Sequence, residues 1–286
     1  MRPRLGAALA GVVLVATAAA CTGGDRAGRT LIQNKGSDTM VNIAQSWAEN
    51  YYQWTDAEVG VAVSGGGSGT GIAALINGTV DIANASRAIK ASERDAIRKA
   101  NGEDAVEHVV AADAVAFFVH KDNPLVGLTV QQLACIYGEG GDCVSWPAVD
   151  AEVPGCAGQE IILVSRQSNS GTYVFIRESV LGKERDFKLG SRDMQGSKDV
   201  VDLVAKTPCA IGYSGLGYAT EDVTALCVRA DETAVCVPPT LETAASGRYV
   251  LARPLFMYTL GEPTGAINDY LDWIRAAPGQ KIVAET

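Results

Sequence analysis

The chain has 286 residues, of which 24 are Lys or Arg and 33 are Asp or Glu, so its formal net charge at pH 7 is −9. An acidic chain is a poor partner for nucleic acid, whose phosphates attract basic surfaces. It can still bind a small anion where backbone dipoles and one or two cations are concentrated locally. The length suits two lobes of ordinary domain size.

Residues 1–20 have the pattern of a signal peptide. Arg2 and Arg4 precede an uncharged run, residues 5–20, that is too short to span a bilayer comfortably and ends in three alanines. Cys21 follows directly and opens a polar stretch, residues 21–28, that we interpret as a tether. This start resembles that of a bacterial lipoprotein, although Ala18 stands where such signals usually carry Leu. We expect an exported chain held at the membrane by lipid on Cys21, with secretion and a free Cys21 as the alternative.

The seven cysteines are an odd number, and acylation of Cys21 leaves six that can pair. In an oxidising compartment we expect up to three disulfides among them, with fifteen pairings open. The six are Cys135, Cys143, Cys156, Cys209, Cys227 and Cys236. No metal site is expected, because there is no C-x-x-C pair and His108 and His120 are the only histidines. No cofactor is expected either.

Along the chain, short β-branched runs alternate with longer segments of helical spacing, which is typical of an α/β architecture. The expected strands are residues 59–64, 80–85, 114–120, 160–165, 210–213, 223–228 and 255–260. The expected helices are residues 39–54, 71–77, 92–101, 129–137, 172–181, 197–206 and 264–276. Residues 142–158 and 231–239 are rich in Pro, Gly and Cys and are expected to be surface loops.

Three loops, residues 36–39, 64–71 and 166–172, place glycine or hydroxyl residues where a helix should begin. The first N–H groups of a helix lack partners within it and lie at the positive end of its dipole. Glycine lets the backbone approach a ligand, and Ser or Thr adds a hydroxyl donor. Each loop alone could be an ordinary helix cap. Together they predict a site for one tetrahedral oxyanion, with Arg166 pairing with two of its oxygens.

Other interpretations of these loops fail on the residues present. Residues 65–71 lack the Lys of a nucleotide-binding P-loop. Residues 69–74 fit G-x-G-x-x-A, but no clear ribose-binding acid follows. Ser214 departs from G-x-S-x-G, and neither histidine suggests a catalytic triad. A phosphatase would need a nucleophile or a metal cluster, so we do not expect an enzyme.

At these residues the chain resembles the phosphate-binding proteins of bacterial ABC-type phosphate transporters. The pieces that carry the resemblance stand in the same order, at residues 36–40, 64–71, 78–83, 120–124, 166–172 and 210–213. The resemblance implies an α/β, two-lobed periplasmic-binding-protein (Venus flytrap) fold with two crossover strands, near residues 114–120 and 253–260. We expect lobe 1 at residues 29–113 plus 257–286, and lobe 2, which holds the disulfides, at residues 114–256.

The resemblance also implies how such a protein works. Phosphate would bind in the cleft of a monomeric receptor, which then delivers it to a membrane permease and its ATPase. Another oxyanion such as sulfate, molybdate or arsenate is the alternative ligand, and a phosphate sensor is an alternative function.

The same resemblance implies a ligand set drawn from both lobes. Its members are Asp38, Thr39, Ser68, Ser86 and Arg87 in lobe 1, and Arg166, Ser170, Gly171 and Thr172 in lobe 2. Many members of the family carry Asp where this chain has Arg87, and that Asp accepts the proton that hydrogenphosphate carries and sulfate lacks. We expect Asp38 to accept this proton, with an ordinary helix N-cap as the alternative. Arg87 would then add a second cation or pair with Asp38.

Overall fold

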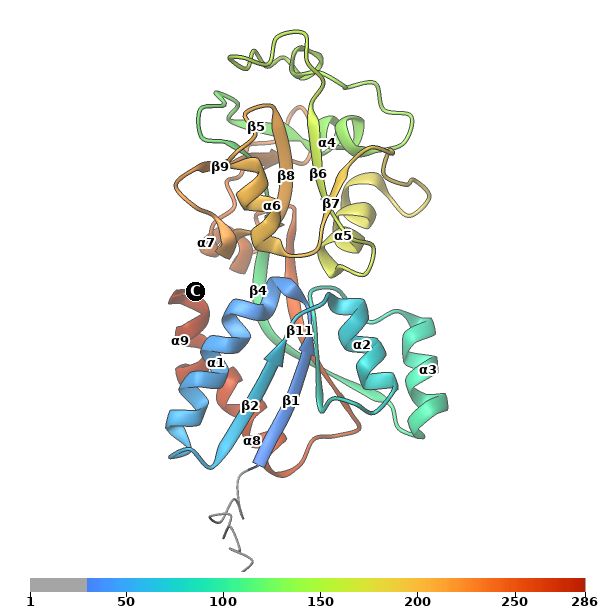
Figure 1. Cartoon of the computed structure of the whole chain (residues 1–286), viewed down its shortest axis with the longest axis vertical. Coiled ribbons are helices and arrows are strands. Elements are labelled where there is room, and N and C mark those ends of the chain that lie inside the picture. Colours follow the sequence, from blue (N-terminus) through green and yellow to red (C-terminus); the bar gives the residue numbers. More distant parts are fainter. Residues whose placement is uncertain (1–29, 286) are drawn as a thin grey trace, which may run out of the picture.

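The computed structural model describes residues 30–285, which form two lobes joined by two long strands (Figure 1). The joining strands are β4 (Ala105–His120) and β11 (Ala252–Leu260). The expected α/β fold with two lobes and two crossover strands is therefore confirmed. The predicted signal peptide, tether and Cys21 lie outside the described residues, and the lobe limits given above stay a prediction.

The first lobe, at the bottom of Figure 1, is built on a sheet of order β2-β1-β3-β11-β4. Its other elements are β1 (Thr30–Gly36), β2 (Val59–Ser64), β3 (Ile82–Ala85), the 3-10 turn η1 (Asp38–Met40), α1 (Val41–Trp54), α2 (Ser68–Ile76), α3 (Ala91–Asn101), α8 (Gly265–Arg275) and α9 (Ala277–Glu285). Side chains of β11 alternate between two cores, because successive residues of a strand point to opposite faces. Leu255 and Met257 join the core under α1 and α8, whereas Phe256 and Tyr258 join the core under α2 and α3.

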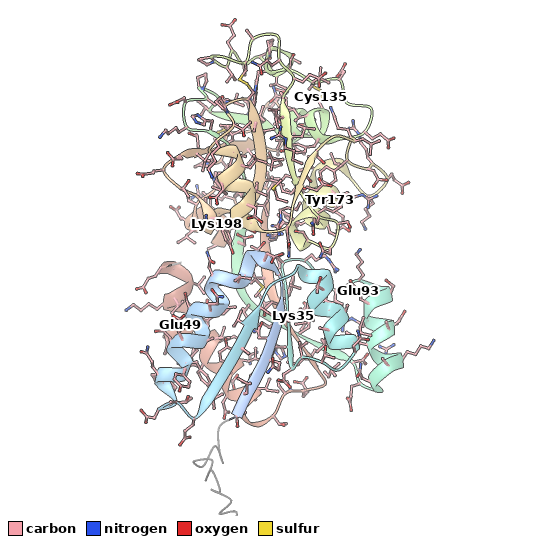
Figure 2. All side chains as sticks on the ribbon, in the orientation of Figure 1. Lys35, Glu49, Glu93, Cys135, Tyr173 and Lys198 are labelled. Carbon is pink, nitrogen blue, oxygen red and sulfur yellow. A yellow bond between two sulfur atoms is a disulfide. The ribbon has the colours of Figure 1, made fainter. Side chains whose placement is uncertain are left out.

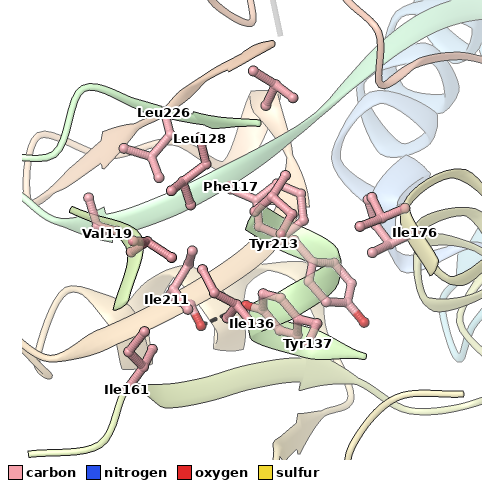
Figure 3. Close-up of a cluster of buried hydrophobic side chains, with 14 of the residues drawn as sticks. Phe117, Val119, Leu128, Ile136, Tyr137, Ile161, Ile176, Ile211, Tyr213 and Leu226 are labelled. Atoms are coloured by element: carbon pink, nitrogen blue, oxygen red, sulfur yellow. Dashed lines mark hydrogen bonds between the residues drawn. The ribbon is translucent and has the colours of Figure 1, made fainter. Parts of the chain in front are cut away.

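The second lobe continues from β4 through β8 and β6 to β7, with β9 also paired to β4 and a separate β5-β10 pair. Its elements are β5 (Gly127–Thr129), α4 (Val130–Tyr137), η2 (Trp146–Val149), β6 (Ile162–Arg166), α5 (Gly171–Ile176), η3 (Arg177–Leu181), β7 (Arg192–Met194), α6 (Ser197–Val204), β8 (Ala210–Gly215), η4 (Leu216–Tyr218), β9 (Val223–Ala225), β10 (Cys227–Arg229) and α7 (Leu241–Ala245). Phe117 and Val119 enter the larger core, where Tyr137 donates a hydrogen bond to the carbonyl of Ile211 at 2.9 Å (Figure 3).

Strand β4 changes partners where the lobes meet. It pairs antiparallel with β11 from Ala105 to Ala114 and antiparallel with β8 from Val115 to Val119. One continuous strand thus belongs to both sheets.

Among residues 30–285, no helix is long and apolar enough to cross a membrane.

The expected elements are found, but some bounds differ and β1, β5, β7, α7 and α9 were not expected. Strand β1 was not expected, because Gln33, Asn34 and Lys35 break its apolar pattern, yet β1 pairs with β2 and β3 and Asn34 is buried. Strand β4 begins nine residues before the expected start, at Ala105. The expected strand 223–228 is divided into β9 and β10, which pair with different strands.

All six cysteines in the described part of the chain form disulfides, and they resolve the pairings left open by the sequence. The pairs are Cys135–Cys143, Cys156–Cys209 and Cys227–Cys236. The paired cysteines of Cys135–Cys143 and Cys227–Cys236 are 8 and 9 residues apart in the sequence, whereas those of Cys156–Cys209 are 53 residues apart. The long-range bridge joins the expected surface loop 142–158 to the residue that precedes β8.

We expect removal of the Cys156–Cys209 bridge to destabilise the fold more than removal of Cys135–Cys143. Loop-closure entropy predicts a loss of about 4 kcal/mol for the longer loop and about 2.5 kcal/mol for the shorter one. Urea unfolding of the two double Cys→Ala variants, compared with the parent, measures this difference. Equal losses would mean that local packing, and not loop length, sets the contribution of each bridge.

Candidate functional site

The three loops singled out in the sequence meet between the lobes. They follow the carboxyl ends of β1, β2 and β6, and a fourth loop at Ser86 follows β3. In α/β sheets, ligands bind outside the carboxyl ends of parallel strands. Strands β1 and β2 point toward the second lobe in Figure 1, so this rule places the site at the contact between the lobes.

Three buried serines of the first lobe form one hydroxyl cluster. Ser37 Oγ donates to Ser86 Oγ at 2.9 Å, and Ser86 N donates to Ser68 Oγ at 3.0 Å. Ser68 is the first residue of α2 and follows Gly66 and Gly67, whose φ angles of 116° and 95° favour glycine. The glycine-rich loop therefore turns the chain so that a helix start and its hydroxyl face the second lobe.

The loop of residues 166–172 packs directly against this cluster. Asn169 accepts a hydrogen bond from Gly69 N at 3.0 Å, and its side-chain amide donates to the carbonyl of Gly66 at 2.9 Å. A methyl group on Gly171 would overlap the hydroxyl oxygens of Ser68 and Ser86. Only glycine at this position lets the lobes approach so closely, and the lobes are closed on one another here.

Arg166 ends β6 and is 1% exposed. Its guanidinium donates to Ser197 Oγ at 2.8 Å, to the carbonyl of Gln195 at 2.7 Å and to Asp38 Oδ2 at 3.3 Å. Its Nε has no partner among the described residues. Burial lowers the pKa of Arg166 and Asp38 opposes this shift, but a guanidinium remains charged at neutral pH. The lobes therefore share a buried cation.

Asp38 lies at the centre of the contact, and its side chain is 15% exposed. Its Oδ1 accepts a hydrogen bond from Gly66 N at 2.9 Å, and its Oδ2 faces Arg166. Tyr218 of the second lobe donates to its carbonyl oxygen at 2.6 Å. The side chain makes no cap of its own helix, since neither η1 nor α1 has a side-chain cap. The N-cap alternative is therefore wrong, and the carboxylate faces the other loops.

Two threonines from opposite lobes also meet in this region. Thr39 Oγ1 and Thr172 Oγ1 are 2.9 Å apart, and both lie near Arg253, a residue that the sequence did not predict for the site. Arg253 is 4% exposed and donates through Nε and Nη2 to Asp113 Oδ2 at 2.9 and 2.8 Å. Burial raises the pKa of Asp113, while Arg253 offsets part of that shift. The sequence carries no clear signal for this pair, because Asp113 and Arg253 lie just before the expected strands 114–120 and 255–260.

Ser170 caps the helix that follows the loop of residues 166–172. Its hydroxyl oxygen accepts hydrogen bonds from Thr172 N at 3.2 Å and Tyr173 N at 3.4 Å, so it caps α5. Because the hydroxyl hydrogen takes no part in these bonds, it stays free to donate. Gly171, the first residue of α5, lies against Ser68 and Ser86, and the Ser170 hydroxyl next to it keeps a hydrogen to donate.

The expected pairing of Arg87 with Asp38 is wrong. Arg87 donates to both carboxylate oxygens of Glu93 on α3, at 2.8 and 2.6 Å, and to the carbonyl of Ala88 at 2.9 Å. Its charge is therefore offset by Glu93, and the second cation of the cluster is Arg253. The physical reason is proximity, because Glu93 lies in the first turn of the next helix and the loop after Ser86 leads directly into it.

We expect the Arg87–Glu93 pair to act on stability in a pH-dependent way. Burial works against the Glu93 carboxylate, but hydrogen bonds from Arg87 and Lys90 outweigh it, so the pKa of Glu93 is lowered. Such a group stabilises the fold above its unfolded pKa, and this contribution is lost as the pH falls through the folded value. Glu93→Gln should lower the melting temperature by about 2–4 °C at pH 7 and by less at pH 3. Asp95→Asn on the exposed face of α3 is the matched control, and a deficit that persists at pH 3 would contradict the expectation.

A cavity of about 300 Å³ lies beside this cluster, on the side of Tyr218 and α9. Ala111, Ala114, Leu241 and Leu255 make much of its wall, and Asp113 and Glu285 are its charged residues. Its described lining contains no Lys or Arg, so it does not suit an anion. Arg166 and the three serines of the hydroxyl cluster do not line this cavity.

Comparisons with known proteins agree with this geometry. Residues 16–277 match the family model of the PBP superfamily domain, so the chain belongs to that superfamily. The phosphate-binding protein PstS of Pseudomonas aeruginosa is 33% identical over 265 residues, which cover 89% of this chain and 81% of that protein. The Bacillus subtilis PstS is 29% identical over 250 residues, with coverages of 87% and 76%. Within the superfamily, the chain is thus a member of the PstS family of phosphate-binding proteins.

Solved structures show the same relationship. An ABC-type phosphate transport receptor from Vibrio cholerae superposes with a TM-score of 0.68 at 27% identity, covering 89% of this chain and 97% of that one. A Clostridium perfringens structure with bound phosphate, assigned to a phosphate ABC transporter substrate-binding protein, gives a TM-score of 0.77 at 27% identity. That match covers 90% of this chain and 97% of the other.

Proposed function

We propose that this chain is a non-enzymatic receptor that captures inorganic phosphate between its lobes and delivers it to an ABC-type permease and its ATPase. The observation that carries the proposal is the convergence of buried donors from both lobes around Arg166, with Asp38 as the carboxylate among them. Membership of the PstS family supports phosphate as the anion.

The proposed ligands come from the loops of the first lobe, from the start of α5 and from the Arg166 guanidinium. They are Thr39, Ser68, Ser86, Arg166, Ser170, Gly171 and Thr172, with Asp38 as acceptor. A hydrogen bond to a charged partner contributes about 1.5–3 kcal/mol, so several of them together support tight binding after ordering costs are met. Arg87 is kept out of this set, because Glu93 engages its guanidinium.

Asp38 would distinguish phosphate from sulfate. At neutral pH phosphate carries a proton on at least one oxygen, and that O–H can donate to the Asp38 carboxylate. Sulfate has no such proton, so one of its oxygens would face the carboxylate without a hydrogen between them. Built-in repulsion of this kind is a common source of specificity.

The location of the receptor also belongs to this proposal. The N-terminal pattern of residues 1–20 supports export, and Cys21 supports attachment by lipid to the outer face of the cell membrane. Mass spectrometry of the protein isolated from its own cells tests both points. An unmodified Cys21 would contradict lipid attachment, and an intact residue 1–20 segment would contradict cleavage.

Titration calorimetry tests the function directly. The chain without its signal segment and Cys21, residues 22–286, is titrated with phosphate, arsenate and sulfate at pH 7.5. We expect binding of phosphate at micromolar concentration or below, with weak or no binding of sulfate. Absence of binding by all three anions would overturn the oxyanion proposal, and preference for sulfate would overturn phosphate as the ligand.

A further inference from the structure

Arg253 has a position that the phosphate site alone does not require. It lies on β11 opposite Asp113 on β4, and these are the two strands that join the lobes. Its Nη2 is 3.3 Å from Thr39 Oγ1 in the first lobe and 3.0 Å from Thr172 Oγ1 in the second. One nitrogen at the hinge is therefore bonded to a proposed ligand residue of each lobe.

These contacts set the direction of the threonine hydrogen bonds. A guanidinium can only donate, and the two hydrogens of Nη2 serve three acceptors, Asp113 Oδ2 and the two threonine oxygens, so at least one hydrogen is shared. Neither threonine hydroxyl hydrogen is used by Arg253. Thr39 Oγ1 and Thr172 Oγ1 are 2.9 Å apart, so one hydroxyl donates to the other. One hydroxyl hydrogen of the pair is left over and can be donated to an anion.

The positive charge of Arg253 is stabilised by Asp113 and by the ring of Phe175. Nε and Nη2 both donate to Asp113 Oδ2, and the guanidinium carbon lies 5.2 Å from the centre of the Phe175 ring. Nη1 has no partner among the described residues, although Arg253 is 4% exposed. If Arg253 served only to join the two strands, its ion pair with Asp113 would suffice. The additional hydrogen bonds to Thr39 and Thr172 would not be needed for that role.

We propose that Arg253 is a positioning residue of the oxyanion site: its guanidinium fixes the Thr39 and Thr172 hydroxyls as donors and reaches both of them only when the lobes close. This inference rests on the proposed function, since it concerns the same site. Opening of the lobes separates Thr39 from Thr172, so the closed state gains a hydrogen bond between the threonines and a bridge through Arg253. The pair at the hinge thereby couples closure to anion binding.

Phosphate titration of single and double variants tests the inference. Arg253→Met removes the charge and the donors, whereas Arg253→Lys keeps the charge beside Asp113 but cannot bond to Asp113 and both threonines together. We expect both to weaken phosphate binding by about tenfold or more, a loss of about 1.4 kcal/mol. Arg248→Gln, which removes an exposed arginine paired with Glu242, is the matched control and should leave the affinity unchanged. Thr172→Val is combined with Arg253→Met in a double-mutant cycle.

The cycle separates positioning from a merely structural role. If Arg253 acts through Thr172, its replacement should cost much less in the Thr172→Val background than in the parent. Additive losses, or full affinity in Arg253→Lys, would overturn the inference. Should Arg253→Met fail to fold, the lysine variant gives the answer in both backgrounds. A parent that binds no phosphate would count against the proposed function, whereas an unaffected Arg253→Met would count against Arg253 alone.

Discussion

Arg166→Met should lower the affinity for phosphate by about 100-fold or more. Two charge-assisted hydrogen bonds from one guanidinium contribute about 3 kcal/mol or more together, and about 1.4 kcal/mol corresponds to a factor of ten. Methionine fills much of the same space without the charge, so the effect falls mainly on the anion. Titration calorimetry with phosphate at pH 7.5 measures it.

The control for this variant is Arg192→Gln. Arg192 lies in the same lobe, on β7 beside β6, but its side chain is exposed. It should bind phosphate like the parent. Melting curves without ligand show whether Arg166→Met stays folded, which matters because Ser197, Gln195 and Asp38 lose a shared donor. A folded Arg166→Met variant with nearly parental affinity would exclude Arg166 as the main cation of the site.

Asp38→Asn should reduce the preference for phosphate over sulfate by about tenfold or more, the equivalent of one lost or reversed hydrogen bond of about 1.4 kcal/mol. Asparagine keeps an oxygen that can accept from Gly66 N, so the loop geometry is conserved. Its amide can donate, however, and a donor suits sulfate as well as phosphate. Phosphate binding should weaken while sulfate binding becomes stronger.

Parallel titrations of both anions with the parent, Asp38→Asn and Glu49→Gln measure this change. Glu49 is an exposed acid on α1 (Figure 2), and Glu49→Gln removes the same formal charge at a distance from the loops. If Asp38→Asn and Glu49→Gln alter the two affinities alike, the general charge of the lobe is responsible. If the ratio of affinities stays at the parental value, Asp38 does not receive the proton of phosphate.

The sequence predicted the loops well, because their chemistry is local. A strand followed by Ser, Gly or Thr and then by helical spacing specifies a helix start, whatever packs around it. Strand β6 ends at Arg166 and α5 begins at Gly171, each within one residue of the expected boundary. The same reasoning missed β1, since its buried Asn34 looks like a surface residue until the neighbouring strands are known.

The partners of the charged side chains could not be predicted in this way. Arg87 was expected near Asp38, but Glu93, six residues along the chain, is its partner. Asp38 instead faces Arg166, which is 128 residues away. Arg253 and Asp113 are separated by 140 residues and meet only because β4 and β11 are register partners. Ion pairs follow three-dimensional proximity, which a linear pattern specifies only within one or two turns.

The sequence by itself thus determined the fold class, the oxyanion chemistry of the loops and the presence of Arg166, because each of these depends on residue types in short segments. The tertiary structure decided which disulfides form, which carboxylate meets which cation and where the lobes touch. Those features depend on three-dimensional contacts that short segments do not specify. At the interface between the lobes, Gly171 fits against Ser68 and Ser86, and Arg253 reaches a threonine of each lobe.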